Sequence, residues 1–234
     1  MNIESNERLI RRNARIAQIS MIAGLVVLVG GMVLSFQSPD QFGLSLAALL
    51  IGFTLSQIGI FFGNRWGRHP RPDEILNQAL KGLDGRYTLY HYRTPTAHLL
   101  VGPAGIWAIF PRNQRGNITY EKGRYRQRGG GIMAGYLKMF AQEGLGRPDL
   151  DIEHDRENLQ KFLQSKLESE NIPPIQAALV FTSDKASIEI DEDTELPAVT
   201  LTANKLKEHI RKFAKRKPIS LDRAQEIQRV LSES

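Results

Sequence analysis

The residues that could do chemistry are chiefly basic. Between residues 112 and 128, arginine and lysine alternate with Tyr120 and Tyr125, a composition suited to phosphate contacts and to stacking on nucleic-acid bases. A second basic group follows near the C-terminus. For the first group nucleic acid and anionic lipid are equally good partners, whereas lipid is favoured for the second. The first group is Arg112, Arg115, Lys122, Arg124, Arg126 and Arg128, and the second is Lys205, Lys207, Arg211, Lys212, Lys215 and Arg216.

Groups that carry nucleophilic or metal chemistry are sparse. The chain has no cysteine, which excludes thiolate metal sites, and no G-x-S-x-G motif for serine hydrolysis. His154 lies among acidic residues, but consecutive helical residues point in different directions, so the segment 153–157 is better interpreted as a solvated acidic face. Glycines 129–131 lack the following Lys-Ser/Thr of a nucleotide-binding loop and predict a linker. We therefore expect no catalytic triad, no metal site and no cofactor.

Two uncharged apolar runs near the N-terminus predict a transmembrane hairpin. Residues 16–36 and 42–62 each match the roughly 20 apolar residues that cross a bilayer as a helix, and the short segment between them allows only a tight turn. A cleaved signal peptide is the competing interpretation, but the first run is longer than the apolar core of a signal. Neither run contains an ionisable residue, which argues against a transporter or channel. The hairpin is therefore expected to be an anchor.

The charges that flank these runs predict their orientation. Arginines precede the first run and follow the second, while the connecting loop carries only Asp40, so the positive-inside rule places both termini in the cytoplasm. We expect the membrane to be the plasma (inner) membrane. Small residues recur along the second run, including a GxxxG match from Gly59 to Gly63. They fit packing of the second helix on the first, and also self-association of two copies. The flanking arginines are Arg8, Arg11, Arg12, Arg15, Arg65, Arg68 and Arg71.

The sequence after the hairpin predicts a mixed α/β domain. A helix begins at Pro72 and ends near Gly82 or Gly85, and short strand-like runs separated by turn signals predict an antiparallel meander. A nearly continuous apolar run at 175–181 predicts a central strand covered on both faces. The expected strands are 86–92, 98–102, 106–110, 118–120, 124–126, 175–181, 187–190 and 197–201, and the further helices are 132–144, 151–170, 203–216 and 220–232.

This order of elements, a helix, three strands, a helix and a strand, describes an α/β sandwich around a mixed sheet. The chain is thereby divided into five parts. They are a basic cytoplasmic segment (1–15), the transmembrane hairpin (16–63), a linker (64–72), the α/β domain (73–201) and a pair of basic C-terminal helices (202–234).

The run AHLLVGPAGIWAIFPRNQRG at 97–116 has a glycine and apolar pattern that resembles the nuclease-related domain, a branch of the restriction-endonuclease-like PD-(D/E)XK fold. The resemblance covers roughly residues 73–200 and implies that fold together with its order of elements. In that fold two carboxylates on neighbouring strands hold Mg²⁺ or Mn²⁺ beside the scissile phosphate, and a lysine positions or deprotonates the attacking water.

The residues that this chemistry needs are replaced here. Alanine and phenylalanine offer no oxygen ligand, and an arginine stays protonated and cannot serve as a base. The resemblance therefore implies a pseudoenzyme, a fold inherited without its catalytic centre. When the match is made through Gly102, Gly105 and Gly116, the metal-binding aspartate falls on Ala97, the glutamate on Phe110 and the lysine on Arg112, and only the first-helix acid, Glu74, is kept.

Three hypotheses for function follow from these patterns. The leading one is a membrane-anchored, catalytically inactive module that binds or scaffolds a nucleic-acid or protein partner at the cytoplasmic membrane face. The first alternative is a nuclease dependent on Mg²⁺ or Mn²⁺ whose active site has moved, with Asp84 or Glu121 as the replacement carboxylates. The second alternative is a structural protein that faces lipid and binds no nucleic acid.

Overall fold

The structure is a computed structural model that describes residues 1–128, 144–168, 172–191 and 193–233. It divides into two units, a hairpin unit of Glu7–Arg71 and an α/β unit of Met1–Asn6 with Pro72–Ser234. The expected helix at 132–144 falls, apart from Gly144, outside the described residues, and so do glycines 129–131.

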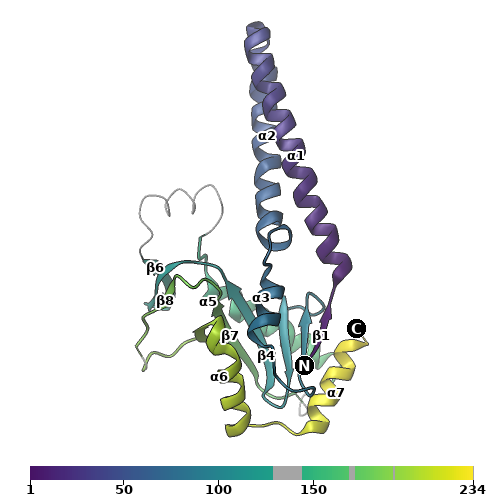
Figure 1. The fold of residues 1–234 in the computed structure, drawn as a ribbon, viewed down its shortest axis with the longest axis vertical. Helices are drawn as coiled ribbons and strands as arrows, with labels where there is room; N and C mark the ends of the chain where they lie inside the picture. Colours follow the sequence, from purple (N-terminus) through teal and green to yellow (C-terminus); the bar gives the residue numbers. More distant parts are fainter. Residues whose placement is uncertain (129–143, 169–171, 192, 234) are drawn as a thin grey trace. The chain divides into compact units, whose positions relative to one another are not determined.

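The hairpin unit consists of two long antiparallel helices, which lie side by side in Figure 1. Both are long and apolar enough to cross a membrane, as the sequence predicts. Large aliphatic side chains on both helices are exposed, among them Val26 and Leu50. The elements are α1 (Glu7–Gln37), the 3-10 turn η1 (Pro39–Gln41), α2 (Phe42–Phe62) and the π-helical turn η2 (Gly63–Gly67).

The small residues of α2 face α1. A Cβ added at Gly52 would lie 2.7 Å from Leu28 Cγ, and one at Gly59 would lie 3.0 Å from the backbone nitrogen of Met21. On the other side of the contact, Gly24 packs against Ser56 in the same close way. Small side chains let two helix backbones approach each other, so this face holds the two helices of one hairpin together.

The α/β unit is built on a six-stranded mixed sheet in the order β1-β2-β3-β4-β7-β9. The strands β2, β3 and β4 form the expected antiparallel meander, and β7 and β9 continue it in parallel with β4. The predicted central strand at 175–181 is confirmed as β7, buried between two parallel neighbours. The strands are β1 (Asn2–Ser5), β2 (Thr88–His91), β3 (His98–Gly102), β4 (Gly105–Arg112), β7 (Ile175–Phe181) and β9 (Val199–Thr202).

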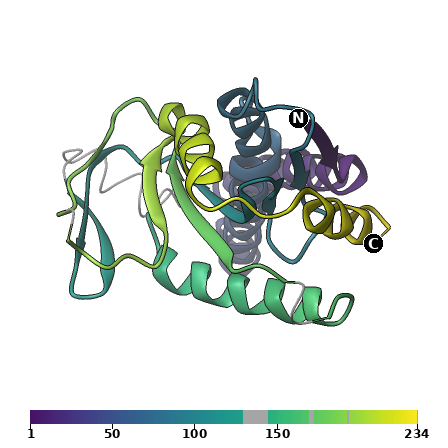
Figure 2. The same cartoon turned by 90° about the horizontal axis from the view of Figure 1, so that it is seen from below.

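Helices cover both faces of this sheet. Leu76 of α3 and Ile210 of α6 pack with Trp107 on one face, whereas Ile152 of α5 and Ile227 of α7 pack with Phe110 on the other. Figure 2 shows α5, in green, and α6, in yellow-green, on opposite sides of the sheet. The fold is therefore a three-layer α/β sandwich. The helices are α3 (Pro72–Ala79), α5 (Pro148–Gln164), α6 (Ala203–Arg216) and α7 (Leu221–Ser232).

Strand β1 is the element that the sequence does not predict. Residues 1–15 are expected to be a basic segment, but Asn2–Ser5 form a strand parallel to β2, and α1 begins at Glu7, nine residues before the uncharged run. Four mostly polar residues carry almost no alternation of apolar and polar side chains, so the partner strand alone determines this element. The C-terminal helices likewise belong to the α/β unit rather than forming a separate part.

A second, three-stranded sheet carries the first basic group. Strands β5 (Gly116–Glu121) and β6 (Arg124–Arg128) form the expected hairpin, and β8 (Ala186–Ile188) adds in parallel to β5. The sheet order is β6-β5-β8.

Candidate functional site

The positions that the resemblance assigns to catalysis lie on two faces of the main sheet. Phe110 is 7% exposed and belongs to the core on the α5 side. Ala97 precedes β3, where its carbonyl accepts a hydrogen bond from the Tyr92 N–H at 2.8 Å. Glu74 lies on α3, whose Leu76 packs into the core on the opposite face. The sheet therefore separates the one remaining acid from Phe110.

Arg112, at the lysine position, is held by α5. Its guanidinium donates to Asp151 Oδ2 at 2.6 Å, and Asp151 lies in the first turn of α5. The positive charge thus faces a carboxylate of the same unit, at the end of the strand where the resemblance implies a metal and a water-positioning lysine. Among the described residues, no group of three or more His, Asp or Glu side chains could hold a metal ion.

A second carboxylate at the start of α5 is also paired. Asp149 is mostly buried and accepts three hydrogen bonds from the Arg147 guanidinium, the shortest at 2.6 Å. These bonds hold the pKa of Asp149 below its usual value, against the opposing effect of burial. Asp149 is therefore a structural anion that fixes the entry to α5.

The two carboxylates proposed for a relocated metal site are paired with arginines as well. Asp84 accepts from Arg86 at 2.6 Å, which lowers the pKa of Asp84. Glu121 accepts from Arg128 at 2.7 Å and lies 3.9 Å from Arg126. The two acids belong to different parts of the unit, the loop before β2 and the small sheet, so they do not form a common site.

The small sheet separates its arginines from its tyrosines. Arg124, Arg126 and Arg128 alternate along β6 and so share one face, whereas Tyr125 points to the other. The Tyr125 hydroxyl lies 2.8 Å from Thr200 Oγ1, and burial raises its pKa to about 12. The Tyr120 ring packs edge-to-face on Tyr125. The stacking of bases on Tyr125 that the sequence indicates would therefore require this core contact to open.

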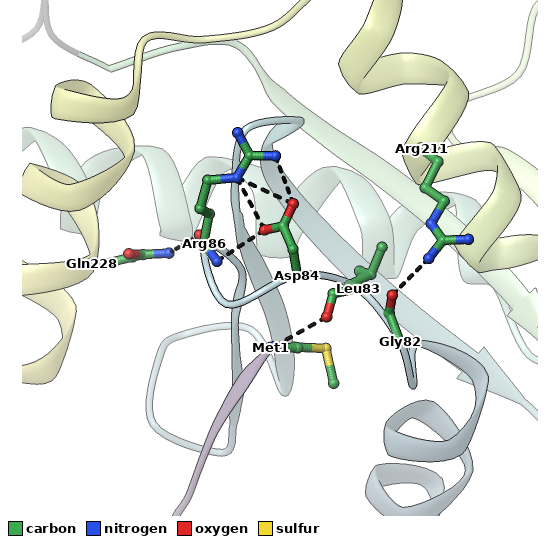
Figure 3. A network of polar contacts seen from close by, with 7 residues as sticks. All are labelled: Met1, Gly82, Leu83, Asp84, Arg86, Arg211 and Gln228. Atoms are coloured by element: carbon green, nitrogen blue, oxygen red, sulfur yellow. Dashed lines mark hydrogen bonds and ion pairs between the residues drawn. The ribbon is translucent and has the colours of Figure 1, made fainter.

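The second basic group partly braces its own unit, as Figure 3 shows for Arg211. Arg211 donates to the Gly82 carbonyl at 2.6 Å and Lys207 to the Lys81 carbonyl at 3.1 Å, both in the turn that follows α3. Lys212 pairs with Glu208 one helical turn away. Cations near a helix C-terminus satisfy its last carbonyls and complement its dipole. Lys205, Lys215 and Arg216 are the exposed members for which the described residues provide no ion pair.

The loop at 81–86 is a meeting point for several segments. Besides α6, the Met1 ammonium donates to the Leu83 carbonyl, and Gln228 of α7 donates to the Arg86 carbonyl (Figure 3). An open groove of about 440 Å³ lies beside this loop, lined partly by Glu74 and Lys81. Glu74 thus borders a groove on the α3 face and not the strand on which the resemblance places the other metal-binding positions.

A buried histidine pair is the polar cluster that sequence reasoning missed. His91 of β2 and His98 of β3 are directly opposed in the sheet, with their Nδ1 atoms 2.8 Å apart. His91 Nε2 also lies 3.0 Å from Asn77 Oδ1 of α3. The available signal was the antiparallel register, which pairs residues 91 and 98 across the β2–β3 connection.

The glycines that carry the resemblance have structural roles. A Cβ at Gly102 would collide with the Tyr87 ring, so only glycine fits there without displacing that ring. Gly105 and Gly116 have φ values of +88° and +87°, a region that side chains disfavour. This framework serves the fold whether or not a catalytic centre is present.

Comparisons of the chain with protein-family models, with curated proteins and with solved structures found no match. The resemblance to the nuclease-related domain therefore rests on the residue pattern at 97–116 and on the order of the elements.

Proposed function

We propose that this chain is a membrane-anchored relative of the nuclease-related domain that has lost phosphodiester cleavage and acts as a binding or scaffolding module at the cytoplasmic membrane surface. The observation that carries the proposal is the pairing of Arg112 with Asp151, next to a core-buried Phe110. A hydrophobic side chain and an internal ion pair occupy the strand end where metal-dependent cleavage would need oxygen ligands.

The order of elements supports the family relation. Helix α3, strands β2, β3 and β4, helix α5 and strand β7 occur in this order along the chain, with β5 and β6 between β4 and α5, and β4 and β7 are parallel. This is the helix, three strands, helix and strand order that the resemblance implies for the restriction-endonuclease-like fold.

The length and exposure of the helical hairpin support an anchor. The uncharged part of α1 and the whole of α2 each have just over 20 residues, which at about 1.5 Å per residue gives about 30 Å, the thickness of a bilayer's hydrocarbon core. A hairpin with apolar side chains on its outer surface is costly in water and favourable in lipid.

The pairing of β1 with β2 indicates on which side of the membrane the two ends of the hairpin lie. Residues before α1 and residues after α2 belong to one sheet, so two crossings return the chain to the side from which it started. The excess of arginine at these ends favours the cytoplasmic side.

The test of catalytic silence uses the full chain in detergent, because a fragment beginning at Pro72 would lack β1. The protein is incubated with plasmid and single-stranded DNA in Mg²⁺ or Mn²⁺, beside a Glu74→Gln variant. The proposal predicts the same background cleavage for both proteins. Metal-dependent cutting that Glu74→Gln abolishes would overturn it and favour a nuclease with a moved active site.

A structural protein that faces lipid is the second candidate, favoured by the core position of Tyr125 and the pairing of Arg128 with Glu121. Gel-shift titration of the full chain with single-stranded DNA over a range of salt separates the two. Binding that weakens with salt supports a nucleic-acid partner. No shift at low salt, with vesicle binding intact, supports the lipid-facing protein.

A further inference from the structure

The first turns of α1 carry an arginine stripe, defined as Arg8, Arg11, Arg12 and Arg15. Their spacing of three, one and three residues places all four within an arc of about 100° on one face of the helix. All four side chains are exposed, and within the described residues no ion pair or hydrogen bond neutralises them. Glu7 is the one carboxylate in the same part of the helix. The stripe is therefore a concentrated, uncompensated positive charge.

The same face of α1 becomes aliphatic immediately after the stripe. Ile19, Ile22 and Val26 continue the arc and are 59%, 56% and 64% exposed. The opposite face, with Gly24 and Gly31, packs against α2. The arginines thus lie in line with the side chains that would face lipid, and away from the helix partner.

The length of α1 determines the depth in the bilayer at which its exposed face changes from arginine to aliphatic side chains. About 22 residues from Ile16 onward span about 33 Å, which fills the hydrocarbon core, and the nine residues Glu7–Arg15 extend about 13 Å beyond it. Lipid phosphates occupy that layer. Guanidinium groups match phosphate oxygens with two parallel hydrogen bonds, so both charge and shape fit.

We propose that the arginine stripe is a binding surface for the phosphate groups of anionic phospholipids. This inference rests on the proposed insertion of the hairpin, and it adds a partner that the anchor alone does not require. An uncharged helix end would anchor equally well in any bilayer, whereas this one selects anionic lipid.

The test measures lipid enrichment around the full chain in nanodiscs made from phosphatidylcholine and phosphatidylglycerol. The two faces of a nanodisc are equally accessible, so the orientation of insertion does not affect the result. The variant replaces all four arginines of the stripe by glutamine. A matched variant replaces Arg156, Lys161, Lys185 and Arg229, exposed residues of the α/β unit outside both basic groups, by glutamine, so that both variants lose the same charge.

We expect phosphatidylglycerol to be enriched about fivefold around the wild-type chain. Each cation near an anionic membrane surface contributes about 1 kcal/mol, which corresponds to about a fivefold preference. The stripe variant should show no enrichment, and the matched variant should keep it. Equal enrichment around all three proteins would overturn the proposal while leaving the anchor intact. A chain that fails to enter nanodiscs would overturn the anchor and the stripe together.

Two further arms distinguish the source of the phosphate. If inorganic phosphate at moderate concentration abolished the enrichment, the stripe would be a free-phosphate site and not a lipid surface. If single-stranded DNA bound the wild-type chain and not the stripe variant, the partner would be nucleic acid. Enrichment that persists against both competitors supports the lipid assignment.

Discussion

Several basic side chains of the α/β unit form hydrogen bonds or ion pairs within that unit, whereas among the described residues no such bond holds the four arginines at the start of α1. Arg112, Arg147 and Arg211 each donate to a carboxylate or a carbonyl that fixes a helix or a loop. The arginine stripe has no such partner and continues into an exposed aliphatic face. The net charge of +6 therefore has two components, basic side chains that stabilise the fold and basic side chains that are left without a partner. Only the basic side chains without a partner in the fold indicate a ligand.

The largest expected effect tests where the first residues belong. The Asn2 N–H donates to the Tyr87 carbonyl just before β2 and the Asn6 N–H to the His91 carbonyl at its end, so by alternation the Glu4 N–H also points to β2. Glu4→Pro removes that donor and leaves a buried carbonyl without its partner, which should destabilise the edge of the sheet by up to about 3 kcal/mol. Hydrogen exchange of residues 86–92 should accelerate strongly. Glu4→Gln, which loses only the ion pair with Arg93, is the control, and equal exchange in both variants would contradict the assignment of β1.

Packing inside the hairpin should give the next largest effect. Gly52→Leu forces a side chain into the Leu28 contact, and overpacking of this kind costs about 1–3 kcal/mol. Gly30→Leu is the matched control, because no atom lies within 4 Å of a Cβ placed there. Thermal unfolding of the full chain in detergent, followed by helical circular dichroism, should separate the two variants. Equal losses would mean that α2 does not pack through its small residues.

Replacing one arginine in each unit by alanine tests the difference in the roles of their basic side chains. Arg211→Ala removes the hydrogen bond to the Gly82 carbonyl and should lower the free energy of unfolding of the α/β unit by about 1 kcal/mol. Arg15→Ala should leave that free energy unchanged. Urea titration with hydrogen exchange of β2 as the readout measures both. A loss from Arg15→Ala as large as that from Arg211→Ala would remove the distinction between the two units.

The smallest expected effect is a dependence of the stability of the α/β unit on pH. Burial, followed by the charges of Arg216 and Lys212, lowers the pKa of His209, which packs edge-to-face on Trp107. The unfolded chain then binds a proton more readily than the folded one, so stability is lost as pH falls through and below the unfolded pKa of about 6.5. His209→Gln should reduce the fall in melting temperature between about pH 7.5 and 5.5. An unchanged slope would show that His209 does not contribute.

Much of the fold could be predicted from local patterns. The apolar run at 175–181 and the amphipathic segment at 203–216 have strong periodicity, and they became β7 and α6 within the expected bounds. Strand β1 could not be predicted, because its four residues have no pattern of their own and depend on β2. The positions that the resemblance assigns to catalysis could be read from the sequence, but their side-chain partners could not. The pairing of Arg112 with Asp151 joins residues 39 positions apart, and only the packing of α5 on the sheet brings them together.

The central claim is that residues 7–71 form a transmembrane hairpin that holds the α/β unit, β1 included, on one side of a membrane. The absence of cysteine gives a clean background for single-cysteine labelling with a membrane-impermeant maleimide in sealed vesicles. Asn2→Cys and Asp184→Cys should react from the same face, and Asp40→Cys only from the opposite face. Reaction of all three variants from one face would contradict the claim.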